Sequence, residues 1–212
     1  MQITTSEAEQ YCAALTEDEP DLLKEINRDT HANVLQPRML SGHFQGRLLS
    51  LISHLIKPKR ILEIGTYTGY SALCMAEGMA ADGKLITIEY DEEKACIARE
   101  NIAKSSYVNQ IEVINQPALD VIPQLNETFD LVFIDADKMN YQAYYDAVFP
   151  KVNSGGIILS DNVLWDSKVF DPSKNDNTTT YLRDFNQTLK NDKRTQKILL
   201  PIRDGLFVSR KI

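Results

Sequence analysis

The chain has 212 residues, of which 43% are hydrophobic and 25% are charged, and its formal net charge at pH 7 is -7. This length and apolar content suit one domain with a sizeable core. The acidic balance argues against nonspecific binding to nucleic acid or anionic membranes, and no stretch approaches the roughly 18 consecutive apolar residues of a membrane span.

The first part of the chain predicts helices only. Its opening segment has neither the basic start nor the apolar run of a secretory signal, so we expect a cytoplasmic protein. Ser6 with Glu9 matches a capping box, and the start signal Asp18–Pro20 precedes a second set of apolar positions. Apolar residues then recur at helical spacing from Leu48 to Ile56. We therefore expect two short helices followed by a third.

From residue 58 onward, short apolar runs alternate with amphipathic stretches. The runs predict strands at Arg60–Ile64, Lys84–Glu89, Ile111–Asn115, Phe129–Ile134 and Gly156–Ser160. The stretches between them predict helices at Tyr70–Met79, Glu92–Ser105, Ala118–Gln124 and Tyr141–Phe149. Strands that alternate with helices of this length form a parallel sheet covered on both faces. The fold class is therefore a doubly wound, Rossmann-like α/β fold.

The C-terminal part predicts a different arrangement. A helix at Thr179–Lys190 is followed by two closely spaced strands, Gln196–Pro201 and Gly205–Arg210, which should pair as an antiparallel hairpin at the sheet edge. This completes a mostly parallel sheet of seven strands. The chain has no repeat and no linker, so one domain over residues 1–212 is expected, with N-terminal helices in 1–57 and an α/β core in 58–212.

Ligands of open α/β sheets bind at the carboxyl ends of the strands. The first strand ends in a segment with Gly65 and Gly69, where glycine allows a tight turn and close approach to a ligand. A glycine pair is otherwise an ordinary turn, and its spacing differs from the GxGxxG of NAD and FAD folds. The second strand ends in Glu89, which could bind ribose hydroxyls, since Asp91 is better placed to cap the next helix.

Two later strand ends carry oxygen ligands. Asp135 follows one strand, and Asp161 with Asn162 follows the next. Each alone would more often be a turn or cap residue. Together they form a hard oxygen set without histidine or thiolate, which suits Mg²⁺ first and also Mn²⁺ or Ca²⁺, and leaves positions open for water and substrate.

Cysteine and histidine, the other common metal ligands, show no metal-binding pattern in this sequence. The three cysteines lie far apart and never form a CxxC pair, which argues against disulfides and a thiolate metal site. His31, His43 and His54 are scattered over the predicted N-terminal helices without a neighbouring ligand pattern, so they should cap or pack.

Four segments together resemble the cation-dependent class I O-methyltransferases, the group of plant caffeoyl-CoA and animal catechol O-methyltransferases and their bacterial relatives. The resemblance runs from about Met39 to Ile212. Its most specific segments are Leu62–Ser71, Phe133–Lys138, Ser160–Trp165 and Leu200–Gly205. It implies an S-adenosylmethionine (AdoMet) site made by Ser41, Glu63, Gly65, Thr66, Ser71, Glu89, Ala118 and Asp135.

Within that site, the resemblance gives the residues different roles. Those from Glu63 to Ser71 would hold the amino acid part of AdoMet, Glu89 the ribose and Ala118 the adenine, while Ser41 offers a backbone contact. It also implies Asp135, Asp161 and Asn162 as metal ligands. Asp135 and Lys138 would be catalytic, with Lys138 as general base; as an alternative, Lys138 is a solvated charge at the rim.

The expected reaction is methyl transfer from AdoMet to a hydroxyl of a small vicinal dihydroxy aromatic acceptor. Trp165 and Phe170 would wall the acceptor or simply pack. The resemblance also implies a homodimer with the N-terminal helices near the interface or over the active site. Two alternatives stay open: a noncatalytic AdoMet-binding module, and an acceptor hydroxyl on an RNA nucleobase, met by a local basic patch of Lys168, Lys174, Arg183 or Lys190.

Overall fold

The computed structural model describes residues 6–212, with side chains from residue 7 onward. Within this range the chain forms one mixed sheet in the order β3-β2-β1-β4-β5-β7-β6. Neighbours from β3 to β5 run parallel, whereas β7 pairs antiparallel with both β5 and β6. The strands are β1 Arg60–Ile64, β2 Lys84–Glu89, β3 Ile111–Asn115, β4 Phe129–Ile134, β5 Val152–Ser160, β6 Thr195–Leu200 and β7 Leu206–Lys211. The predicted α/β fold and its edge hairpin are confirmed.

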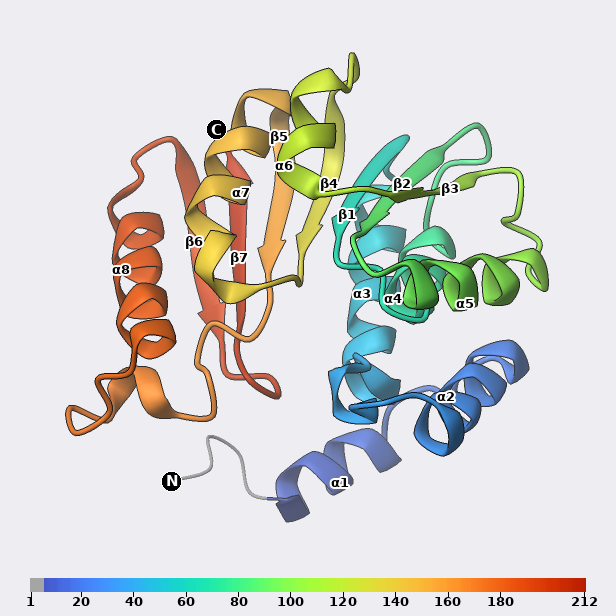
Figure 1. The fold of residues 1–212 in the computed structure, drawn as a ribbon, viewed down its shortest axis with the longest axis horizontal. Coiled ribbons are helices and arrows are strands. Elements are labelled where there is room, and N and C mark those ends of the chain that lie inside the picture. The colour runs from blue at the N-terminus through green and yellow to red at the C-terminus, as the bar shows by residue number, and fades with distance from the viewer. Residues whose placement is uncertain (1–5) are drawn as a thin grey trace.

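Helices cover both faces of the sheet (Figure 1). They are α1 Ser6–Ala14, α2 Asp21–Asn33, α3 Gly42–Ile56, α4 Tyr70–Ala76, α5 Glu92–Ala103, α6 Ala118–Val121, α7 Tyr141–Val148 and α8 Asn177–Asn191. Successive strand residues point to opposite faces. Ile61 and Leu131 therefore pack on the side of α2 to α5, whereas their neighbours Leu62 and Val132 pack on the side of α6 to α8.

The order of the strands creates a crevice at the carboxyl ends of β1 and β4. From β1 the chain passes through α4 to β2 on one side, and it later crosses through α6 to β4 on the other side. Such a reversal of direction separates the connections and opens a binding crevice. The Gly65 amide donates to Ile88 O at 2.9 Å, and the Asp135 amide donates to Ile64 O at 2.9 Å. These bonds hold the strand ends that carry the predicted site side by side.

Several predicted boundaries differ from the structure by a few residues, and two of them differ for clear local reasons. Strand β5 starts at Val152 rather than Gly156, because its pairing with β4 shifts register and Gly155 has a φ of +82°. Such an irregularity breaks the alternation from which strands are predicted. Helix α4 ends at Ala76 rather than Met79, where the backbone of Gly78 passes against α3 at His54.

The cysteines and the helices of the structure bear on two further expectations, which concern disulfides and membrane spans. Cys12, Cys74 and Cys96 are all free thiols, but only Cys74 is buried, whereas burial is expected for all three as small apolar residues. In residues 6–212 no helix is both long and apolar enough to cross a membrane. Helix α1 begins at Ser6, but the capping contact predicted for the Ser6 side chain lies outside the described residues.

Candidate functional site

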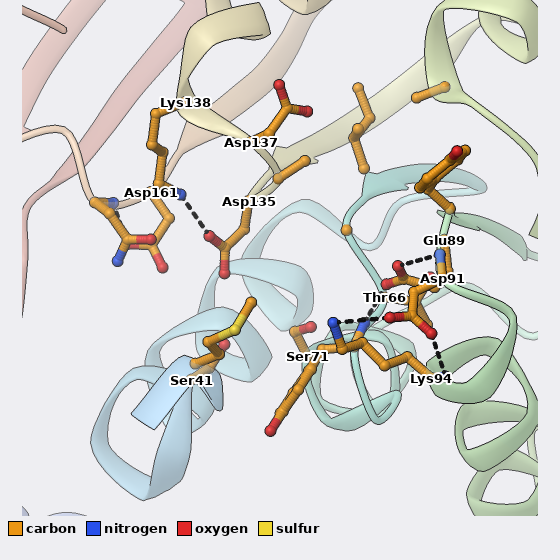
Figure 2. Close-up of a pocket in the computed structure, with 18 of the residues that line it drawn as sticks. Ser41, Thr66, Ser71, Glu89, Asp91, Lys94, Asp135, Asp137, Lys138 and Asp161 are labelled. Carbon is orange, nitrogen blue, oxygen red and sulfur yellow. Dashed lines mark hydrogen bonds and ion pairs between the residues drawn. The ribbon is translucent and has the colours of Figure 1, made fainter. Parts of the chain in front are cut away.

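A cavity of about 1090 Å³ opens at the carboxyl ends of the central strands. Figure 2 shows the labelled side chains in two groups, with Asp135, Lys138 and Asp161 on one side and Thr66, Ser71 and Glu89 on the other. The predicted site residues that line the cavity are Ser41, Gly65, Thr66, Ser71, Glu89, Ala118, Asp135, Lys138, Asp161 and Asn162. The fold thus brings together residues that are far apart in the sequence, since Ser41 and Asn162 share one cavity.

The turn after β1 requires glycine at its first position. Gly65 has a φ of +97°, a conformation that side chains disfavour, and a Cβ there would overlap the carbonyl oxygen of Asp135. Gly69, with a φ of +84°, is the N-cap residue of α4. The absence of a side chain at Gly65 lets the ends of β1 and β4 approach each other and leaves backbone exposed along the cavity wall.

Replacing Gly65 by alanine should destabilise the protein far more than the same change at Gly42. Gly42 also has a positive φ, +71°, but a Cβ there would meet no atom within 4 Å. We expect Gly42→Ala to lower the free energy of unfolding by about 1 to 2 kcal/mol, the cost of a left-handed conformation. Gly65→Ala adds the overlap with Asp135 and should cost about 2 to 5 kcal/mol. Denaturant unfolding of both variants measures the difference; equal losses would contradict it.

Glu63 lies one layer behind the cavity wall. Its fully buried carboxylate accepts hydrogen bonds from Ser71 Oγ at 2.5 Å and Thr87 Oγ1 at 2.5 Å. Burial raises the pKa of Glu63 to about 8, although both hydroxyls favour the charged form. Of this pair only Ser71 lines the cavity, so Glu63 meets the cavity through the Ser71 hydroxyl.

Glu89 lines the cavity and also accepts two backbone hydrogen bonds. Its Oε2 accepts from the Tyr67 amide at 2.8 Å and its Oε1 accepts from the Asp91 amide at 3.0 Å. Each oxygen keeps one further lone pair for a ligand. Asp91 does cap α5, as predicted, by accepting from the Glu93 amide at 3.0 Å. Glu89 therefore joins the turn after β1 to the turn after β2 and also faces the cavity.

The oxygen-rich end of the cavity fits a hard cation. Asp161 is 1% exposed, and burial together with the neighbouring Asp135 carboxylate raises the pKa of Asp161 to about 7. A cation would offset this repulsion. Among the described residues, no cluster of three or more His, Cys, Asp or Glu could hold a metal ion. A site here thus needs the amide oxygen of Asn162, which follows Asp161 with a φ of +54° and lines the same cavity.

Lys138 is part of this end rather than a solvated charge at the rim. Its side chain is 10% exposed, and its Nζ donates to Asp135 Oδ1 at 3.0 Å and to Tyr141 Oη at 2.6 Å. The Tyr141 hydroxyl in turn donates to Asp161 O at 3.0 Å. Sequence reasoning missed Tyr141, although its spacing of three residues from Lys138 places both on one side of the turn before α7.

The loop after Asn162 supplies one cavity wall. Trp165 lines the cavity and packs on the core, whereas Phe170 is 55% exposed and is not among the lining residues. The prediction that Phe170 walls the acceptor is therefore wrong. Arg183 holds the loop by donating from Nε to Val169 O at 2.7 Å and from Nη2 to Lys168 O at 2.9 Å. Arg183 is therefore engaged within the protein rather than directed to RNA.

The three histidines lie outside the cavity lining. His31 contacts Asn27 O at 2.9 Å and His54 contacts Ser50 O at 2.9 Å, each one helical turn earlier. His43 contacts Glu17 O at 2.7 Å, in the segment before α2. His31 and His54 are exposed and their contacts lie within their own helices, so the predicted capping or packing role is not seen for these two.

Comparison with known proteins gives a consistent family. A family model described as O-methyltransferase matches residues 13–212. A catechol O-methyltransferase of Niastella koreensis is 38% identical over 149 residues, covering 68% of this chain and 67% of that protein. Caffeoyl-CoA O-methyltransferase 5 of Nicotiana tabacum is 35% identical over 206 residues, covering 92% of this chain and 85% of that protein. The crystal structure of an O-methyltransferase from Bacillus cereus in complex with SAH superposes with a TM-score of 0.88 at 31% identity, covering 100% of both chains.

Proposed function

Because the chain belongs to the O-methyltransferase family, we propose that it methylates one of two adjacent hydroxyls of a small aromatic acceptor with the help of a divalent cation. It is an AdoMet-dependent O-methyltransferase of the caffeoyl-CoA and catechol type. One observation carries the finer proposal. Asp135, Asp161 and Asn162, together with Lys138, line the same cavity as the glycine turn after β1. Candidate cation ligands and the glycine turn assigned to the cofactor thus share one cavity. This arrangement suits an acceptor whose two hydroxyls chelate the cation next to the cofactor.

We assign the cofactor to the side of the cavity formed by β1 and β2. Ser71 and Thr66 would surround the amino acid part of AdoMet, with the Ser41 backbone opposite and Glu63 behind Ser71. The free lone pairs of Glu89 would accept from the ribose hydroxyls. Ala118, at the start of α6, would lie against the adenine. Support for this assignment comes from the turn after β1, because Gly65, Thr66 and Ser71 all line the cavity.

Asp135, Asp161 and Asn162 would hold the cation, with Mg²⁺ favoured and Mn²⁺ or Ca²⁺ also suited to oxygen ligands. When bound, AdoMet supplies an electrophilic methyl group, and the cation lowers the pKa of a hydroxyl that contacts it. In its neutral amine form, Lys138 Nζ would receive the hydroxyl proton, and the Tyr141 hydroxyl lies 2.6 Å from that nitrogen. Trp165 confines the acceptor ring, so that its oxygen meets the cofactor in a narrow range of orientations.

A panel of paired acceptors tests the proposal directly. With Mg²⁺ present, a catechol should be methylated at least about 10²-fold faster than the monophenol that lacks one hydroxyl, because the second oxygen fixes the orientation of the first. Methyl transfer from labelled AdoMet measures both rates. An equal rate on the monophenol would contradict chelation and leave only the family-level activity.

We further propose a cytoplasmic homodimer. Tyr11 of α1, Leu15 directly after α1, and Leu51 and Leu55 of α3 are large apolar side chains that are all more than half exposed, and α1 contacts α3. A second copy would bury this surface. Light scattering at micromolar concentration should give about twice the 24.0 kDa chain mass, and Leu51→Lys should shift it toward one chain. A 24.0 kDa species alone for the unmodified protein would contradict the dimer.

A further inference from the structure

Gln45 is a buried amide that connects Asp161 to Arg203. It lies on α3 with 1% of its surface exposed, and its Nε2 donates to Asp161 Oδ2 at 2.7 Å. On its other side, Arg203 Nη1 donates to Gln45 Oε1 at 3.1 Å. Three segments that are far apart in the chain thus meet through one side chain: α3, the end of β5 and the turn between β6 and β7.

Arg203 fixes which way the Gln45 amide points. A guanidinium group only donates hydrogen bonds, so the atom of Gln45 that faces it must be the amide oxygen. Nε2 is then left to face Asp161, as a donor. Arg203 is itself held, because its Nη1 also donates to Leu40 O at 2.8 Å and to Ser41 O. The amide therefore has one orientation that satisfies both neighbours.

Gln45 orients Asp161 without neutralising it. Asp161 Oδ2 accepts from the Gln45 side chain, and Asp161 Oδ1 accepts from the backbone amide of Asn162 at 2.8 Å. Both donors are uncharged, so neither cancels the charge that Asp161 offers to a cation. Two donors on different oxygens set the plane of the carboxylate and leave each oxygen with a further lone pair. A lysine in place of Gln45 would instead supply the positive charge that a cation should supply.

We propose that Gln45, held by Arg203, is a positioning residue that orients Asp161 for binding a divalent cation. The inference rests on the proposed function, in which Asp161 is a metal ligand. Donors that hold a ligating carboxylate in place typically change metal affinity by roughly 10- to 100-fold when they are removed. Gln45 contacts neither the acceptor nor the cofactor in this assignment, so its effect should appear in metal affinity.

The test is a Mn²⁺ titration followed by electron paramagnetic resonance, on full-length protein purified without metal. Gln45→Met keeps the length of the side chain but removes the amide, and it should weaken Mn²⁺ binding by roughly 10- to 100-fold. Its melting temperature and AdoMet affinity should stay close to those of the unmodified protein. Activity should recover at high Mn²⁺, with the apparent Mn²⁺ requirement raised and kcat little changed. A purely structural role would not produce this separation.

Ser53→Ala is the matched control. Ser53 lies on the same helix, is fully buried, and donates to Met75 O of α4 at 2.5 Å rather than to Asp161. It should bind Mn²⁺ like the unmodified protein. Unchanged Mn²⁺ affinity in Gln45→Met would overturn the inference. If Gln45→Met does not fold, Arg203→Met decides, because it frees the amide to turn and should also weaken Mn²⁺ binding; unchanged affinity there would overturn the inference equally.

Asp161→Ala separates this inference from the proposed function. It should abolish specific Mn²⁺ binding, because it removes the ligand itself. If the unmodified protein binds no Mn²⁺, the cation site of the proposed function fails and the role of Gln45 fails with it. If the unmodified protein binds Mn²⁺ and Asp161→Ala does not, while Gln45→Met still binds normally, only the role of Gln45 fails.

Discussion

Chelation of divalent cations should abolish methyl transfer to a catechol, and added Mg²⁺ or Mn²⁺ should restore it. Asp161→Ala should have the same effect irreversibly, with a rate loss of roughly 10³-fold, because the several kcal/mol by which a cation stabilises the developing oxyanion are lost. AdoMet affinity should be nearly unchanged, since Asp161 lies with Lys138 and Asp135 and away from Glu89 (Figure 2). Asp135→Ala should differ, because Asp135 is assigned to both the cation and the cofactor, and both affinities should fall.

Rates with EDTA and with Mg²⁺, together with calorimetry for AdoMet, measure these effects. Asp82→Ala is a suitable control because the Asp82 carboxylate is exposed and pairs with Lys59 at 3.5 Å, before β2 and away from the cavity lining. It should leave both rate and affinity unchanged. Metal-stripped enzyme that methylates a catechol as fast as the Mg²⁺-loaded form would refute the role of the cation.

The sheet could be predicted because its parallel strands are buried on both faces. Continuous apolar runs such as Leu131–Ile134 are typical of such strands, and the observed bounds of β1 to β4 equal the predicted ones. Strand β5 was predicted too short because its first half deviates from regular pairing near Gly155. The hydrophobic pattern therefore fails to predict a strand where local backbone geometry, rather than burial, determines the conformation.

The strand-end rule could also place the oxygen-rich group, because parallel strands bring their carboxyl ends to one edge. It says nothing about side chains that arrive from elsewhere. Gln45 and Arg203 approach Asp161 from α3 and from the hairpin turn, and neither has a local pattern that marks it. Glu89 shows the same limit, since the Tyr67 amide that it accepts from belongs to another turn. Tertiary hydrogen bonds become visible only when the elements are placed.

Phe170 shows a second limit, which is the direction of a loop side chain. Residues 165–167 all have positive φ values, at Trp165 (+49°), Asp166 (+52°) and Ser167 (+64°). This turn leaves Trp165 on the cavity and Phe170 exposed outside it. Three consecutive left-handed residues without glycine are uncommon, so a polar, turn-rich sequence from Asp166 onward does not give the direction of the side chains around it.

Lys138→Met should lower kcat by roughly 10²-fold or more, the usual contribution of a positioned general base, with little change in Mn²⁺ affinity. The prediction rests on placement: Lys138 Nζ lies 3.0 Å from Asp135 Oδ1 and 2.6 Å from Tyr141 Oη, on the cavity wall. Tyr141→Phe should give a smaller loss, because Lys138 stays but loses the hydroxyl that holds it. Steady-state assays at saturating Mg²⁺ and catechol measure kcat for both variants.

Lys138→Arg distinguishes proton transfer from a simple ion pair. An arginine keeps a positive charge beside Asp135, so it would preserve activity if Lys138 served only to pair with that carboxylate. Arginine cannot accept a proton in proteins, because its side chain stays charged at any accessible pH. If Lys138 Nζ receives the proton of the acceptor hydroxyl, Lys138→Arg should therefore be as slow as Lys138→Met. A kcat near that of the unmodified enzyme would instead assign Lys138 to holding Asp135 and leave the proton to solvent.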